Sequence, residues 1–204
     1  RIDFKDFFPS IRGENIRLFL KNTDLNLNDL EITLINLLVC KKDKLTTGAS
    51  SSPSITNAIL FDFDKSLFDI CSKKGIKYSR YADDLYFSTN EDNQLSSILE
   101  YMYQYKFPYE IKLKINNKKN IFTSKKHKRV ITGLIITTDN NISVGRKKKQ
   151  IIKSLINSYK YNNINDDKKK YLKGYLSYLL SVEPSYIINL KKKYGEDLIN
   201  ELLL

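Results

Sequence analysis

Three carboxylates are placed where they could do chemistry together. Asp83 and Asp84 are adjacent and stand between two strand-like runs rich in Tyr, Ile and Phe, residues 76–82 and 85–89. Asp3 lies in another short apolar run. Carboxylate oxygens are the ligands that Mg²⁺ prefers, and three carboxylates can hold two ions about 4 Å apart for an in-line displacement at phosphorus. The three aspartates therefore predict a two-metal site suited to nucleotidyl transfer.

The alternative for the Asp83-Asp84 pair is an ordinary solvated turn. The pair fills the gap between the two strand-like runs, so we expect both residues at the tip of a hairpin. Adjacent like charges repel, and a tight hairpin favours Asn-Gly or Asp-Gly, so folding alone does not explain the pair. The aromatic residues on either side would hold the hairpin in a packed sheet and present the carboxylates rigidly.

The elements around these carboxylates indicate an α+β fold. Apolar residues at helical spacing predict several helices, one of them with an apolar residue every four positions. In that helix Ser52 is expected to be the N-cap and Pro53 the first helical residue. Helices are expected over residues 12–21, 28–39, 52–75 and 93–106. Further short strands are expected at residues 2–4, 111–115, 120–123 and 130–136.

The composition changes toward the C-terminus. From Lys147 onward the pattern is helical and basic, which places a lobe boundary near Gly145. We therefore expect a mixed lobe at residues 1–145 and an all-helical lobe at residues 146–204.

The charge balance indicates a class of partner. Lys and Arg outnumber Asp and Glu by 35 to 23, a formal net charge of +12. This surplus favours a polyanion, usually nucleic acid, although an anionic membrane surface fits charge alone equally well. No apolar run is long enough to predict a membrane-spanning helix. The single histidine, His127, excludes zinc sites built on several histidines, and Cys40 and Cys71 are expected to be free thiols.

Several segments, in order along the chain, resemble the motifs of retron-type bacterial reverse transcriptases. Together they cover nearly the whole chain, which makes the resemblance far more specific than one short box would be. They are the first palm motif at residues 3–11, the Gly-to-Ser-Pro loop at 45–53 followed by Asn57 and Asp64, the Tyr-Ala-Asp-Asp box at 81–84, Asn-x-x-Lys at 116–119, Ile-Thr-Gly at 131–133 and a thumb-like tail at 172–184.

The resemblance implies a right-hand polymerase palm at residues 1–145, an antiparallel sheet packed on helices, and an all-helical thumb at 146–204. The fingers would precede residue 1. It implies an RNA-templated DNA polymerase of the bacterial cytoplasm that acts in antiphage defence, as many relatives do. The implied partners are two Mg²⁺ ions (with Mn²⁺ as a substitute), dNTPs, a structured noncoding RNA and its DNA product. An effector protein or a second copy of the chain are further candidates, and no membrane is expected.

The resemblance also assigns residues to the metal site. Asp3, Asp83 and Asp84 match the metal-binding carboxylates, and the carbonyl of Phe4 would be an additional ligand. Lys119 matches a proton donor to the leaving pyrophosphate. The alternative for Lys119 is a solvated lysine.

A second set would contact the incoming nucleotide. Asp6 and Phe7 would offer backbone N–H groups to the triphosphate. Phe8 matches an aromatic gate that fills the space of a ribose 2′-hydroxyl, which predicts dNTP over NTP; its alternative is an ordinary core aromatic. Thr47 and Gly48 would lie against the nucleotide.

A third set would contact nucleic acid. Lysines can neutralise phosphates while neighbouring tyrosines stack on bases or sugars. The alternative is that the lysine runs are solvated helix faces. The expected contacts are Tyr81, Thr132, Gly133, Arg146, Lys147, Lys148 and Lys149. The chain departs from the family at Thr46, where Pro is usual, and this change is expected to loosen the start of the loop.

Two other functions compete with the leading one. A related defence enzyme would make DNA with a protein primer or without a template. A catalytically silent RNA-binding scaffold would need no metal site, and the intact set of three aspartates argues against it.

Overall fold

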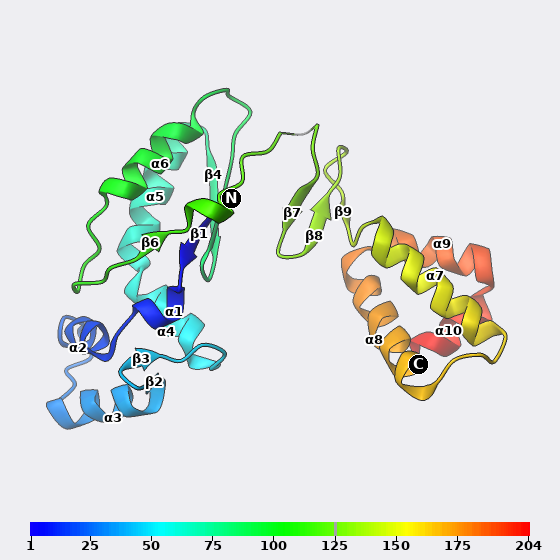
Figure 1. The fold of residues 1–204 in the computed structure, drawn as a ribbon, viewed down its shortest axis with the longest axis horizontal. Coiled ribbons are helices and arrows are strands. Elements are labelled where there is room, and N and C mark those ends of the chain that lie inside the picture. The colour runs from blue at the N-terminus through cyan, green and yellow to red at the C-terminus, as the bar shows by residue number, and fades with distance from the viewer. Residues whose placement is uncertain (125) are drawn as a thin grey trace. The chain divides into compact units, whose positions relative to one another are not determined.

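The computed structural model describes residues 1–124 and 126–204, which form two compact units. Arg1–Phe122 is the first unit and Thr123–Leu204 the second (Figure 1). Both contain an antiparallel sheet and helices, so the predicted α+β class is confirmed. Across these two described ranges, no helix has the length and apolar character needed to cross a membrane.

A four-stranded antiparallel sheet organises the first unit. Its order is β4-β5-β1-β6, so the first strand of the chain runs between two strands from much later in the sequence. The strands are β1 (Ile2–Lys5), β4 (Lys77–Tyr81), β5 (Asp84–Ser88) and β6 (Lys114–Ile115). Their order means that long-range pairing, not local sequence, decides which residues meet at the centre of the sheet.

Helices make up most of the rest of this unit. The predictions over residues 12–21, 28–39 and 93–106 are confirmed to within two residues at each end. The elements are α1 (Phe7–Ser10), α2 (Gly13–Lys21), α3 (Asp29–Val39), α4 (Ser51–Ile59), α5 (Phe61–Lys73), α6 (Leu95–Gln104), the single 3₁₀ turn η1 (Asn117–Lys119) and the short hairpin of β2 (Cys40–Lys41) and β3 (Lys44–Leu45).

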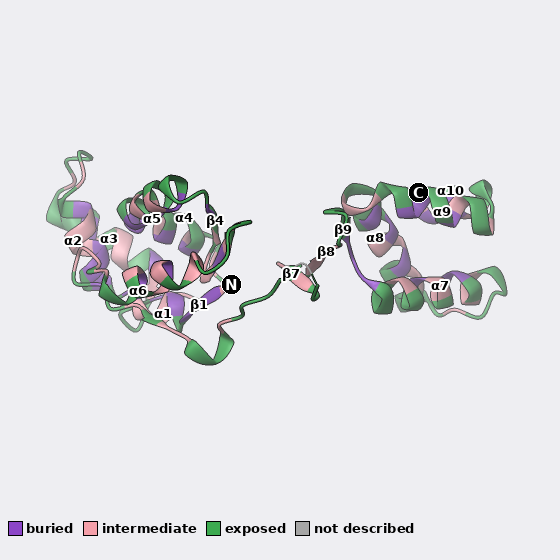
Figure 2. Cartoon of the chain, turned by 90° about the horizontal axis from the view of Figure 1, so that it is seen from above, coloured by how far each residue is buried: buried purple, intermediate pink, exposed green. Residues whose placement is uncertain are grey.

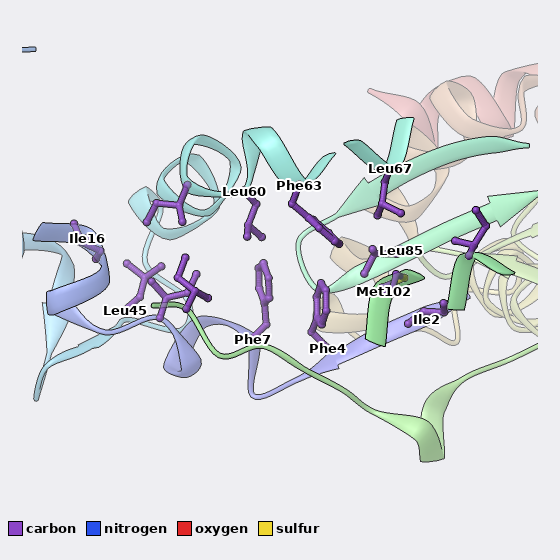
Figure 3. Packing of buried hydrophobic residues seen from close by; sticks show 14 of the residues in the cluster. Ile2, Phe4, Phe7, Ile16, Leu45, Leu60, Phe63, Leu67, Leu85 and Met102 are labelled. Carbon is purple, nitrogen blue, oxygen red and sulfur yellow. The ribbon is translucent and has the colours of Figure 1, made fainter. Parts of the chain in front are cut away.

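An aromatic cluster joins β1 to the helices. The ring of Phe4 lies 5.9 Å from that of Phe7 and 6.0 Å from that of Phe63. Figure 3 shows Phe4 and Phe7 pointing from the N-terminal segment toward Phe63 on α5. Because successive strand residues point to opposite faces, anchoring Phe4 in this core turns Asp3 to the other face of the sheet.

The predicted helix over residues 52–75 is wrong in two respects. The segment forms two helices that break at Leu60, and α4 begins earlier than expected, with Ser50 as N-cap and Pro53 as its third residue. The hydroxyl of Ser52 instead donates to the carbonyl of Thr46 (2.5 Å). Ile59 before the break and Phe63 after it are both buried, so the four-residue apolar spacing continues through the break and cannot reveal it.

Three strand predictions also need correction. Residues 120–123 form no strand, and the N–H of Ile121 donates to the carbonyl of Arg1 (2.9 Å). Of residues 111–115 only the last two are in β6. The single strand expected at 130–136 is a hairpin, β7 (Arg129–Ile131) and β8 (Leu134–Ile136). It turns at Thr132 and Gly133, whose φ angles of +46° and +85° suit a two-residue hairpin loop.

The second unit combines this hairpin with a helical bundle. Buried residues alternate with exposed ones along its helices, as Figure 2 shows for α7. Leu134 and Val144 pack in the same apolar core as the helices, so the compact units divide after Phe122 and not near Gly145. Its remaining elements are β9 (Ile142–Ser143), α7 (Arg146–Lys160), α8 (Asp166–Val182), α9 (Pro184–Tyr194) and α10 (Glu196–Leu203).

Candidate active site

Asp3 and Asp84 are direct neighbours across the sheet. They are paired in register on the antiparallel strands β1 and β5, beside the pair Ile2 and Leu85. Side chains directly opposite each other on adjacent strands start about 5 Å apart at Cβ and share one face. Two like charges at this spacing oppose folding, so the pairing indicates a site that needs both carboxylates.

The hairpin turns one residue earlier than expected. Tyr81 pairs with Asp84, so the two loop residues are Ala82 and Asp83, and Asp84 is the first residue of β5. The prediction that both aspartates form the tip is therefore wrong. The reason is that Asp84 pairs with Tyr81 on one side and with Asp3 on the other, which draws it into the sheet.

Asp83 remains attached to β1 through its backbone. Its carbonyl accepts a hydrogen bond from the N–H of Phe4 (3.1 Å). Burial raises the pKa of the Asp83 carboxyl, and a hydrogen bond from its own backbone opposes the rise. The charges of Asp3 and Asp84 raise this pKa further, while Lys119 lowers it. Asp3 and Asp84 therefore lie close enough to Asp83 for their charges to affect its ionisation.

A short turn after β6 holds Asp3, of which only 4% is exposed. The backbone N–H of Asn116 donates to the Asp3 carbonyl (2.7 Å), and its side-chain amide donates to Oδ1 (3.2 Å). Lys119 Nζ lies 3.5 Å from Oδ2, and the N–H of Lys119 donates to the carbonyl of Asn116 (2.9 Å). The Asn-x-x-Lys segment therefore brings an amide and a cation to one buried carboxylate.

Asp84 has its own pair of partners. The hydroxyl of Tyr86, two residues along the same strand, donates to Oδ2 (3.0 Å), and Arg1 Nε lies 3.5 Å from Oδ1. Tyr81, on the same face as Asp84, is 69% exposed. An exposed tyrosine beside the carboxylates is available to contact a bound chain.

The three carboxylates have the donor chemistry that a divalent cation needs. In the described residues no three His, Cys, Asp or Glu side chains already converge as an ion site. Two of the three carboxylates are instead compensated by the cations of Lys119 and Arg1. Mutually repelling oxygen ligands that pair with cations of the protein have the chemistry to hold a hard divalent cation in place of Lys119 and Arg1.

The residues expected near the triphosphate follow β1 directly. Asp6 is exposed, has φ +47° and precedes α1 as its N-cap residue. Phe7 is buried, and its ring lies 5.2 Å from that of half-buried Phe8. Phe7 is thus the core anchor of this turn, and Phe8 is the aromatic ring that stays partly open to solvent.

The loop with Thr47 and Gly48 is exposed but well supported. Gly48 has φ +85°, and the space around its Cα is open. Thr46 donates to the carbonyl of Val39 through its N–H (3.3 Å) and its hydroxyl (3.1 Å). The expectation that Thr46 loosens the loop is wrong, because proline could not make the first of these bonds.

In the second unit, the predicted contact residues differ in their surroundings. Thr132 and Gly133 are exposed at the turn between β7 and β8. At the start of α7, Arg146, Lys147 and Lys148 are exposed. Lys149 is half-buried: its ammonium forms an ion pair with Glu183 and lies 4.6 Å from the centre of the Tyr186 ring. Lys149 therefore has a structural role within this unit.

The sequence analysis assigned no role to Arg80 or to Asp64, which form an ion pair under the hairpin. The available signal was the alternation of β4, which places an arginine on the core-facing side of a strand, where an unpaired charge would be costly.

A family model and several curated relatives match this chain. Residues 1–172 match the model described as reverse transcriptase (RNA-dependent DNA polymerase). The chain is 32% identical to Retron Ec83 reverse transcriptase of Escherichia coli, over 99% of this chain and 68% of that protein. It is 30% identical to Retron Ec86 reverse transcriptase of the same organism, over 98% of this chain and 62% of the relative. The chain thus spans about two thirds of the length of these relatives.

Proposed function

This chain belongs to the retron-type reverse transcriptases, a family of RNA-directed DNA polymerases, and on that premise we propose that its first unit carries the polymerase active site. The proposed reaction adds dNTPs to a 3′-hydroxyl on a structured noncoding RNA template. One observation carries the proposal: Asp3 and Asp84 are cross-strand neighbours, with Asp83 in the adjoining turn.

The three aspartates would hold the metal ions, together with the carbonyl of Phe4. The chemistry that two bound Mg²⁺ ions would supply is activation of the attacking 3′-hydroxyl and stabilisation of the leaving pyrophosphate. Mn²⁺ would substitute, since it accepts the same oxygen ligands. Lys119, whose Nζ pairs with Asp3 in this structure, would donate a proton from Nζ to the leaving pyrophosphate.

The turn after β1 would bind and select the nucleotide. The backbone N–H groups of Asp6 and Phe7 would face the triphosphate. Phe8, fixed against Phe7, would occupy the space of a 2′-hydroxyl and exclude NTPs. Thr47 and Gly48 would lie on the other side of the nucleotide, where an exposed glycine allows close approach.

The wider assignment rests on the family. We propose that the first unit acts as the palm, that the helices after residue 146 act as the thumb, and that exposed lysines of α7 contact nucleic acid. We further propose that the protein works in the bacterial cytoplasm in antiphage defence, with an effector protein or a second copy as a partner. The names of the relatives, each a retron reverse transcriptase, support the noncoding RNA as template.

The test is primer extension by the whole protein on an RNA template with dNTPs and Mg²⁺. The wild type should give template-dependent DNA, and Asp84→Asn should abolish it. Asp62→Asn, at an exposed position on α5, is the matched control and should retain activity. DNA made without regard to template would favour the untemplated alternative, and absence of any aspartate-dependent product would overturn the enzyme assignment in favour of a scaffold.

A further inference from the structure

A buried ion pair lies beneath the catalytic hairpin. Arg80, on β4, has only 5% of its side chain exposed, and its Nε donates to Asp64 Oδ1 (2.8 Å) while Nη2 donates to Oδ2. Asp64 comes from α5, and Tyr78 donates its hydroxyl to the same carboxylate (2.6 Å). The pair is thus bidentate and supported by a third side chain, the arrangement in which an arginine is held in one orientation.

The guanidinium has one more contact, to the turn itself. Arg80 Nη1 donates to the carbonyl of Ala82 (3.2 Å). The peptide bond is planar, so fixing the Ala82 carbonyl also fixes the N–H of Asp83. On its other side the Asp83 carbonyl accepts from Phe4 (3.1 Å). Both peptide groups that flank Asp83 are therefore held, one by Arg80 and one by β1.

The backbone at this point needs such support. Ala82 has φ +53°, a left-handed conformation that residues with a Cβ rarely adopt. Conformations of this kind persist only where the surroundings hold them, and they concentrate at functional sites. The hydrogen bond from Arg80 Nη1 to the Ala82 carbonyl supports this left-handed conformation of Ala82.

The protonation states suit the arrangement. Burial lowers the pKa of Arg80, but the hydrogen bond and charge of Asp64 outweigh it and raise the pKa overall, so the guanidinium stays charged. Burial, together with Asp64, raises the pKa of Tyr78, so its hydroxyl keeps the proton that it donates.

We propose that Arg80, oriented by Asp64 and Tyr78, is a positioning residue that sets the orientation of Asp83 for the metal-dependent step. This inference rests on the proposed polymerase function. The guanidinium acts through three separate nitrogens, two on Asp64 and one on Ala82. A lysine, with a single compact ammonium on a flexible stem, cannot make these contacts together.

The competing explanation is purely structural: the ion pair fastens α5 to β4 and has no effect on the turn. Arg80→Lys distinguishes the positioning role from the purely structural one. It keeps the positive charge but loses the planar guanidinium that contacts Asp64 and Ala82 together. Arg17→Lys, an arginine of α2 that pairs with Glu14, is the matched control. The whole protein should be assayed for kcat and for KM of dNTP in primer extension. Hydrogen exchange at residues 82–84, Mn²⁺ binding by electron paramagnetic resonance and thermal unfolding complete the set.

Arg80→Lys should lower kcat about 10–100-fold with KM changed less than about threefold, as expected when a group acts mainly in the transition state. Exchange at Asp83 should speed up while that of α5 stays unchanged, and Mn²⁺ affinity should fall several-fold. Tyr78→Phe removes one support of the Asp64 carboxylate but keeps the guanidinium contacts, so its loss of kcat should be smaller than that of Arg80→Lys. Arg17→Lys should behave as the wild type.

Two results would overturn the inference. One is Arg80→Lys with wild-type kcat. The other is a loss of kcat that only follows the loss of folded protein, with wild-type exchange at residues 82–84. A wild type without polymerase activity would instead contradict the proposed function. Exchange and Mn²⁺ binding would then still decide whether Arg80 positions Asp83.

Discussion

Asn116 holds Asp3 at two points, one on the backbone and one on the side chain. Its N–H donates to the Asp3 carbonyl at 2.7 Å and its amide to Oδ1 at 3.2 Å. Asp3 is nearly fully buried, so these hydrogen bonds replace water around a carboxylate that must stay charged to bind a cation. Asn116 thereby links the end of the sheet to the geometry of the proposed metal site.

Replacing Asn116 should therefore impair activity. Asn116→Ala leaves a buried carboxylate oxygen without its donor, which should cost about 1–3 kcal/mol of unfolding free energy. We expect primer extension to fall at least about tenfold. Asn117→Ala is the control, because that side chain contacts Tyr103 and Asn120 and not Asp3. Equal effects of the two substitutions on extension and on urea unfolding would contradict the assigned role.

The raised pKa of Asp83 predicts a pH-dependent stability. Its folded pKa lies above the unfolded value of about 3.8, so the native state binds more protons there than the unfolded state does. The contribution of Asp83 is therefore present below the unfolded pKa and lost as pH rises through the folded pKa. Without divalent cations, Asp83→Asn should raise Tm at pH 7 by roughly 1–2 °C, and the difference should vanish near pH 3.5.

Adding Mg²⁺ should reverse this order. A ligand that binds only the folded state stabilises it, so the wild type should gain Tm with Mg²⁺ while Asp83→Asn gains little. The measurement is the Tm of both proteins in thermal scans at pH 7 and pH 3.5, each with and without Mg²⁺. A metal-free Asp83→Asn protein that is less stable than the wild type at pH 7 would contradict the prediction that the buried charge of Asp83, repelled by Asp3 and Asp84, destabilises the fold.

Phe8 is predicted to select the sugar. Phe8→Ala opens the space beside Phe7, and discrimination against NTPs should fall at least about tenfold, with dNTP incorporation retained. Phe61→Ala, at an exposed phenylalanine of α5, should leave the ratio unchanged. The ratio of kcat/KM for dNTP and NTP is the measurement. Unchanged discrimination in Phe8→Ala would make this residue a core aromatic only.

The lysines at the start of α7 should separate into two kinds. Lys149→Gln leaves Glu183, 11% exposed, without its cation and should cost about 1–3 kcal/mol in urea unfolding. Lys147→Gln removes an exposed charge, should leave stability within about 0.5 kcal/mol, and should reduce the salt slope of RNA binding by about one. A Lys147→Gln protein with an unchanged slope would remove this residue from the nucleic-acid surface.

The sequence by itself determined the chemical inventory. The three aspartates, the aromatic Phe8 and the order of the motifs pointed to a metal-dependent polymerase, and helical spacing located α2, α3 and α6 closely. Residue type carried the carboxylates and local periodicity carried the helices, whereas the polymerase and the role of Phe8 came from the resemblance of the ordered motifs to a known family. Where an apolar spacing ran through a bend, as at Leu60, the same local evidence failed.

Only the tertiary structure decided how the inventory is assembled. Strand register set Asp3 opposite Asp84 and moved the turn to Ala82 and Asp83. The packing of α5 against β4 then paired Asp64 with Arg80, whose guanidinium also donates to the turn at Ala82. The pairs Asp3–Asp84 and Asp64–Arg80 join residues far apart in the chain, and their energies depend on which strands pair and which faces are buried. Local sequence fixes neither, because shifting a strand by one residue turns every side chain to the other face.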